Sequence, residues 1–189
     1  MDYTWDLSVL YDSFEDSRIE EDFTALEQGL DRVEALLAAD MGDREKLEAY
    51  CDAAEDGFRL SERLGSFANL TLSVEATNAA ALQMMDRLEA LSVREGIVSA
   101  AAGRYIGSIK NLKDVIASSE KLQTFDFALL STAEQAAHIP DEKIHPWLLK
   151  MSLNGGNAFS NLRDRLDATH MVDYQGTEPA PGRCACHGV

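Results

Sequence analysis

The sequence has few of the residues that mark secreted or membrane-spanning proteins. Its 189 residues include only 3 cysteines. Cys51 stands alone, and Cys184 and Cys186 are too close together to build a disulfide framework. The first residues are acidic and lack the basic start and apolar run of a secretory signal, and no segment approaches the ~18 consecutive apolar residues of a membrane span. We therefore expect a cytoplasmic protein with no membrane association.

Positive charge is also scarce. Lys and Arg number 17 against 33 Asp and Glu, which gives a formal net charge of -16. Such a chain repels phosphate backbones and anionic lipid unless it has a local basic patch, and we find none. Residues 1–40 contain many acidic side chains, and their only basic residues are Arg18 and Arg32. This pattern is typical of a solvated surface. No nucleic-acid partner is expected.

The chain also lacks the histidine pattern of a catalytic zinc site. A zinc-binding helix of the His-Glu-x-x-His type places two His at i and i+4 on one face. None of the four histidines is followed by Glu, and no two have that spacing; they are His138, His145, His170 and His187. We assign no metal ligand.

The other candidate sites in the sequence also have simple structural explanations. Glu142 and His145 match one half of a di-iron motif, but the second half is missing and Pro146 follows, so a helix start or surface position is favoured. The segment 154–157 (Asn-Gly-Gly-Asn) lacks the strand and the Lys-Ser or Lys-Thr of a phosphate-binding loop. Cys184, Cys186 and His187 offer too few ligands for structural zinc. Cys51 lies on an apolar stripe and is predicted to be a buried, inert thiol. No catalytic or cofactor-binding residue is assigned, and no cofactor is expected in this chain.

What the sequence does contain is apolar residues, 46% of the total, recurring at helical spacing. A first helix is predicted over 23–37. A second begins near Asp43, its N-cap, and carries Leu47, Phe58, Leu64 and Phe67 on one face toward residue 74. A third follows Thr77 and Asn78 and runs to Ile116, with Gly103 and Gly107 as its easiest bending points.

The C-terminal third predicts shorter elements. A fourth stripe runs from Leu122 to Ala136 and ends before Pro140. A short helix holds Trp147, Leu148 and Met151, the Asn-Gly-Gly-Asn turn breaks it, and a last helix over 158–168 buries Phe159, Leu162 and Leu166. Residues 169–174 resemble a short β-type run. The predicted fold is all-α, an antiparallel helical bundle of about four long helices plus two shorter C-terminal helices and this β-type segment.

Two segments carry a resemblance to a known family. Trp5-Asp6-Leu7 followed by Leu10-Tyr11 resembles the opening signature of oligoendopeptidase F-like zinc peptidases, which are related to thimet oligopeptidase. More specific is the block from Leu149 to Tyr174, in which a short helix, the Asn-Gly-Gly turn, Ala158-Phe159-Ser160-Asn161-Leu162 and a closing Met171-Val172-Asp173-Tyr174 follow the order of that family.

The resemblance implies an all-helical peptidase in which this N-terminal region forms one wall of a deep channel and restricts access to short peptides. In the family, a zinc ion is held by two His and one Glu of a downstream domain, and the motif Glu acts as general base toward a metal-bound water. Zinc is therefore expected in the full-length family member. No zinc-binding position carries over to this chain.

The composition changes after Glu178. Residues 179–189 hold two of the four prolines, two of the three cysteines and no acidic residue. We predict a helical domain over 1–178 and a disordered tail over 179–189, for which translation out of frame is one hypothesis, because a shifted reading of compatible codons resembles the family's continuation.

Three functions remain open from the sequence. The first is an N-terminal fragment of a zinc-dependent oligoendopeptidase that lacks the catalytic domain and is inactive alone. The second is a stand-alone helical module that binds peptides or a partner, and the third is one half of a split metallopeptidase. A fragment predicts exposed apolar surface where the catalytic half would dock, and hence self-association.

Overall fold

The computed structural model describes residues 6–170 and is all-α across them, with no strand in that range. Among these residues, no helix combines the length and the apolar composition of a membrane span. The main helices, in chain order, are α1 (Ser17–Ala38), α2 (Asp43–Val74), α3 (Ala79–Ser108), α4 (Leu112–Ala117), α5 (Glu120–Thr124), α6 (Asp126–Gln135), α7 (His145–Ser152) and α8 (Ala158–Thr169).

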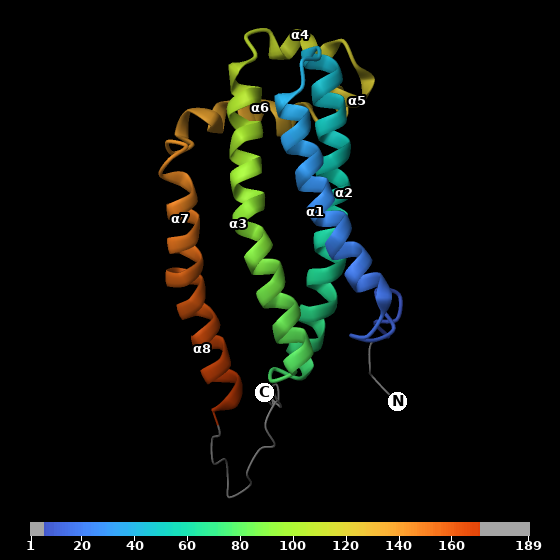
Figure 1. Cartoon of the computed structure of the whole chain (residues 1–189), viewed down its shortest axis with the longest axis vertical. Helices are drawn as coiled ribbons and strands as arrows, with labels where there is room; N and C mark the ends of the chain where they lie inside the picture. Colours follow the sequence, from blue (N-terminus) through green and yellow to red (C-terminus); the bar gives the residue numbers. More distant parts are fainter. Residues whose placement is uncertain (1–5, 171–189) are drawn as a thin grey trace, which may run out of the picture.

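Helices α1, α2 and α3 run up and down beside one another and form the body of the molecule (Figure 1). Local sequence explains two of their starts: the Asp16 side chain accepts a hydrogen bond from the Arg18 amide, and the Asn78 side chain accepts one from the Ala81 amide, each at 2.9 Å. The predicted N-cap of α2 was one residue late. Gly42 occupies the cap, and Asp43 is the first helical residue, where its Oδ1 accepts a hydrogen bond from the Tyr105 hydroxyl at 2.7 Å.

The predicted third and fourth helices are each interrupted. Helix α3 ends at Ser108, Ile109 is extended, and Leu112 and Ile116 belong to the separate helix α4. The fourth stripe is divided near Phe125 into α5 and α6, with a 3-10 turn at Ala136–His138. These breaks let the short helices fold across the end of the bundle, where their apolar residues pack on Leu47 and Ile106. Periodicity predicted the buried residues but not the turns between them.

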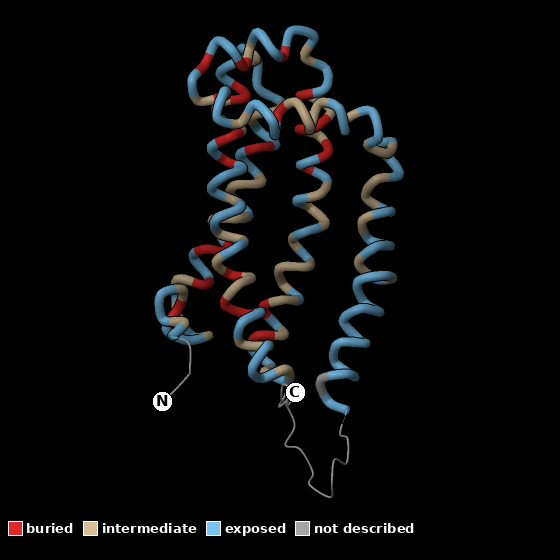
Figure 2. Tube along the Cα trace, turned by 180° about the vertical axis from the view of Figure 1, so that it is seen from behind, coloured by how far each residue is buried: buried red, intermediate tan, exposed pale blue. Residues whose placement is uncertain are grey.

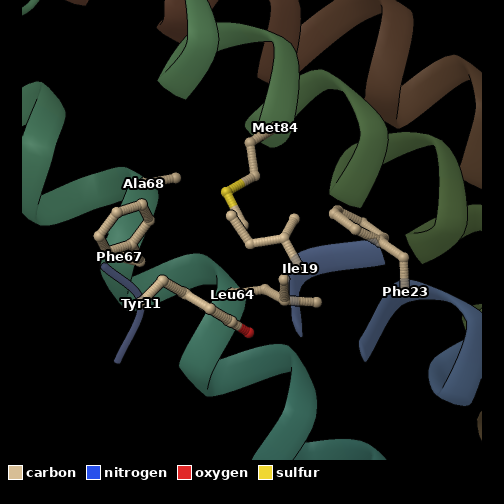
Figure 3. Close-up of a cluster of buried hydrophobic side chains, with 7 residues drawn as sticks. All are labelled: Tyr11, Ile19, Phe23, Leu64, Phe67, Ala68 and Met84. Carbon is tan, nitrogen blue, oxygen red and sulfur yellow. The ribbon is translucent and has the colours of Figure 1, made fainter. Parts of the chain in front are cut away.

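The core is concentrated at the two ends of the long helices. At one end, Tyr11 from the N-terminal segment packs with side chains of α1, α2 and α3, as Figure 3 shows; the cluster consists of Tyr11, Ile19, Phe23, Leu64, Phe67, Ala68 and Met84. At the other end lies the cluster beneath α4–α6. Between them the buried apolar set is small and consists of Val33, Ala53 and Val98. The middle of the bundle therefore has the least side-chain volume.

Glycines on α3 mark where another segment approaches closely. A Cβ at Gly96 would lie 2.9 Å from Leu149 Cδ1, one at Gly103 would lie 2.9 Å from Ile139 Cδ1, and one at Gly107 would lie 2.5 Å from the Cβ of Ala136. The helix passes through Gly103 without ending, so these glycines are needed for close packing rather than for a bend.

The predicted break at 154–157 is wrong. Those residues lie in a π-helical turn, Leu153–Asn157, that joins α7 to α8, so the two helices form one continuous segment (Figure 1). Thr169, predicted as β-type, is the last residue of α8 and His170 is its C-cap. The rest of the predicted β-type segment, 171–174, and the tail 179–189 lie outside the described residues.

Candidate interaction surface on helices α7 and α8

The segment α7–α8 carries a row of apolar side chains that are left exposed within residues 6–170. We call this row the α7–α8 face; its members are Ile144, Trp147, Leu148, Met151, Phe159, Leu162 and Leu166. Phe159 is 74% exposed, and Trp147 and Met151 are each 68% exposed. Figure 2 shows no buried residue along α7, or along α8 up to residue 167. The predicted burial of Phe159, Leu162 and Leu166 within this chain is therefore wrong.

The π-helical turn keeps the row in line. Met151 and Phe159 are eight residues apart, which in a regular α-helix places them about 80° apart around the axis. A single π-helical turn absorbs one additional residue. The turn at Leu153–Asn157 makes the spacing equivalent to about seven α-helical residues, which brings Phe159 closer to the line of Met151.

Few contacts hold this segment to the bundle. Leu149 packs against α3 at Gly96, and the Asn161 Nδ2 donates a hydrogen bond to Glu89 Oε1 at 2.9 Å. The Arg104 guanidinium anchors the preceding loop by donating to the Pro140 carbonyl oxygen at 2.9 Å. Between α8 and the adjoining ends of α2 and α3 lies a groove of about 520 Å³, lined in part by Leu72 and Met85. The contacts position α7–α8 and leave its apolar face free.

The face is large enough to support an interface. Burying one Leu, Met or Phe side chain contributes about 1.5–3 kcal/mol, so covering seven partly exposed apolar side chains corresponds to on the order of 10 kcal/mol before the costs of association. Large exposed apolar patches are typical of interaction surfaces, which makes the α7–α8 face the candidate site.

Charge separates the segment from the body. Residues 6–144 contain 13 basic and 28 acidic side chains, whereas residues 145–170 contain Lys150, Arg163 and Arg165 against Asp164 and Asp167. The net charge is therefore -15 for residues 6–144 and +1 for residues 145–170. An acidic partner therefore meets weaker electrostatic repulsion at the α7–α8 face than at the bundle.

The sequence-predicted candidates do not form a metal centre. His138 and Glu142 are exposed, His145 is half-buried at the start of α7, and His170 is exposed at the end of α8. Within residues 6–170 no three His, Cys, Asp or Glu side chains are placed to hold a metal ion. The donor set of the described chain does not fit the zinc of the peptidase family. His187, Cys184 and Cys186 lie outside the described residues.

Cys51 is buried in the cluster beneath α4–α6, in agreement with the prediction. Burial raises the pKa of its thiol to about 11, because the thiolate loses its hydration in an apolar site. The nucleophilic form is therefore suppressed near neutral pH.

One polar cluster was missed by the sequence analysis. The Tyr11 hydroxyl donates to Asp22 Oδ2 at 2.5 Å, and Arg63 of α2 forms an ion pair with the same oxygen. Burial and the Asp22 carboxylate raise the pKa of Tyr11. Tyr11 and Asp22 are 11 residues apart, and Arg63 lies 41 residues beyond Asp22. The return of the N-terminal segment onto α1 and the packing of α1 on α2 bring the three together. The cluster fastens the N-terminal segment to the bundle.

No protein-family model matches this sequence, and neither the curated proteins nor the solved structures contain a significant match.

Proposed function

We propose that this chain is the N-terminal helical part of an oligoendopeptidase F-like zinc peptidase that hydrolyses short peptides, and that the α7–α8 face packs against the catalytic part of that enzyme. The zinc ligands and the general base of that part are not residues of this chain. The role of the chain is then to form a wall of the peptide channel and to restrict access to it.

The observation that carries the proposal is the uncovered face itself. The block with the more specific resemblance, from Leu149 to Tyr174, overlaps it, and Met151, Phe159 and Leu162 belong to both. Apolar residues at regular spacing on both sides of a π-helical turn are unfavourable when they are exposed to water. They stabilise the protein if a second domain covers them.

The alternatives use the same surface differently. A stand-alone module would bind a peptide or partner there, and the groove of about 520 Å³ beside α8 favours this reading because it combines Leu72 and Met85 with Asn161 and Arg165. In a split enzyme, a separate chain would supply the zinc half and cover the face.

An assay of peptide hydrolysis distinguishes these three hypotheses. The purified chain with zinc and a quenched oligopeptide is expected to show no turnover, because the residues 6–170 offer no zinc site. Turnover only after a second chain is added supports the split enzyme. Turnover by the chain alone would contradict the proposal.

Self-association tests the face directly. Without its covering partner the chain is expected to associate in sedimentation velocity, and Phe159→Asp should shift it toward monomer, because the charge is costly to bury in an apolar contact. Phe127→Asp is the matched control: Phe127 is 81% exposed but lies on α6, outside the face. A wild-type chain that stays monomeric, or an equal effect of both variants, counts against the proposal.

A further inference from the structure

Two cavities meet in the sparsely packed middle of the bundle. The outer cavity, of about 610 Å³, lies between α1 and α2 and is lined by Arg32, Arg59 and Arg63 among others. The inner cavity, of about 300 Å³, lies among α1, α2 and α3. Both are lined by Gly29, Ala53 and Gly57. The two cavities therefore adjoin where the facing helices have almost no side chains.

The two glycines have no structural reason to be glycine. Gly29 and Gly57 are interior positions of α1 and α2, where glycine costs about 1 kcal/mol relative to alanine. Neither has a positive φ, and a Cβ on either would meet nothing within 4 Å. The two glycines leave open space where the cavities share their lining, and we take this space as the passage between them, which a side chain would narrow.

The outer cavity presents donors that lack acceptors. The Nε of Arg63 is buried and has no hydrogen-bond partner, although its Nη2 is paired with Asp22. A buried donor left unpaired costs about 1–3 kcal/mol. Arg32 forms no ion pair within residues 6–170, whereas Arg59 is paired with Asp56. Arg63 therefore keeps one unsatisfied N–H and Arg32 is an exposed charge without an ion pair in residues 6–170, and both side chains line the outer cavity.

The ion pairs of the lining limit the charge of an acceptor placed there. Arg59 is paired with Asp56 and Arg63 with Asp22, which leaves Arg32 as the guanidinium without an ion pair in residues 6–170, with Glu62 as the further carboxylate of the lining. One unpaired guanidinium suits a single carboxylate, whose planar oxygens match arginine, better than a doubly charged phosphate. Beyond the glycines, the inner cavity offers apolar walls from Leu26, Leu30, Leu88 and Leu91.

We propose that these two cavities form a binding site for a small monocarboxylate with an apolar body. The carboxylate lies in the outer cavity at Arg32 and Arg63, and the apolar body passes Gly29 and Gly57 into the inner cavity. A fatty acid and a peptide ending in an apolar residue share this chemistry. The site is independent of the peptidase proposal, because none of its residues belongs to the α7–α8 face.

Calorimetric titration of the full chain tests the site with two probes, octanoate and an N-acetylated dipeptide ending in leucine. Saturable binding of either probe is expected, and the tighter one identifies the source. Arg32→Gln should weaken binding about tenfold, the value of one charge-assisted contact. Arg44→Gln is the control: Arg44 is on α2, pairs with Glu48 and lines neither cavity. Octanamide should bind more weakly than octanoate.

Substitution of the two glycines gives a second test, whose expected result differs from that of a misfolded variant. The double variant Gly29→Ala, Gly57→Ala should raise the unfolding midpoint and lower the affinity for the probe at the same time, because it favours the helices and narrows the passage. The proposal is overturned if neither probe binds saturably up to about 10 mM. It is equally overturned if Arg32→Gln binds as tightly as Arg44→Gln, or if the double glycine variant keeps full affinity.

Discussion

Replacing Gly107 and Gly57 with alanine, one at a time, should change stability in opposite directions. Both are helical glycines, and propensity alone predicts a gain of up to about 1 kcal/mol for each replacement. Gly57 meets open space, so its variant should show that gain. At Gly107 the new Cβ would lie 2.5 Å from Ala136 Cβ and 3.5 Å from the Ala133 carbonyl oxygen. Neither atom belongs to a flexible side chain, so the backbone of one segment must shift.

Overpacking of this kind costs about 1–3 kcal/mol. Gly107 is next to the last residue of α3, where the propensity gain is small. We therefore expect Gly107→Ala to lose about 1–2 kcal/mol and Gly57→Ala to gain about 0.5–1 kcal/mol. In a chain of this size, 1 kcal/mol corresponds to a midpoint shift of about 2–4 °C.

Urea and thermal unfolding followed by far-UV circular dichroism measure both variants. The slope against urea should stay unchanged, since the surface exposed on unfolding is the same. A Gly107→Ala protein as stable as Gly57→Ala would refute the reasoning, because it would mean that Ala136 does not pack against α3. Gly155→Ala offers a further comparison, since a Cβ there also meets nothing within 4 Å.

Two further predictions concern buried polar groups. Tyr11→Phe should lower the free energy of unfolding by about 1–2 kcal/mol, because it removes the hydroxyl that donates to buried Asp22; unfolding in urea measures this, and an unchanged midpoint would count against the cluster. Cys51 should resist thiol reagents at neutral pH until the chain unfolds. Because its folded pKa of about 11 exceeds the ordinary thiol value of 9.0, its contribution to stability is complete below about pH 9 and is lost as pH rises toward 11. Cys51→Ala should flatten that part of the stability profile, and rapid labelling of the native protein would contradict the burial.

Residue patterning allowed much of the helical body to be predicted. The start at Asn78 follows from local cap chemistry, whereas the start of α2 was predicted one residue late, because Gly42 holds the cap without a side-chain hydrogen bond. The buried positions Leu47, Leu64 and Phe67 follow from spacing. Phe58, assigned to the same stripe, is exposed instead. A stripe predicts a face, but in a helix as long as α2 the middle faces a region with little partner volume. Local pattern does not show where the neighbouring helices supply that volume.

The C-terminal segment shows the same limit. The Asn-Gly-Gly-Asn sequence favours a turn by local propensity, yet the structure continues the helix through a π-helical turn. Spacing of Phe159, Leu162 and Leu166 predicted an apolar face correctly and its burial wrongly, since amphipathicity does not say whether the covering surface belongs to the same chain.

Composition and a period of a few residues were enough to predict the all-α class, the excess of acidic residues and which residues are apolar on each helix. The packing of distant segments set the remaining features. It brought Tyr11, Asp22 and Arg63 together, required glycine at Gly107 while leaving Gly29 and Gly57 beside open space, and left α7–α8 uncovered. Each of these depends on distances between segments far apart along the chain, which no local pattern contains.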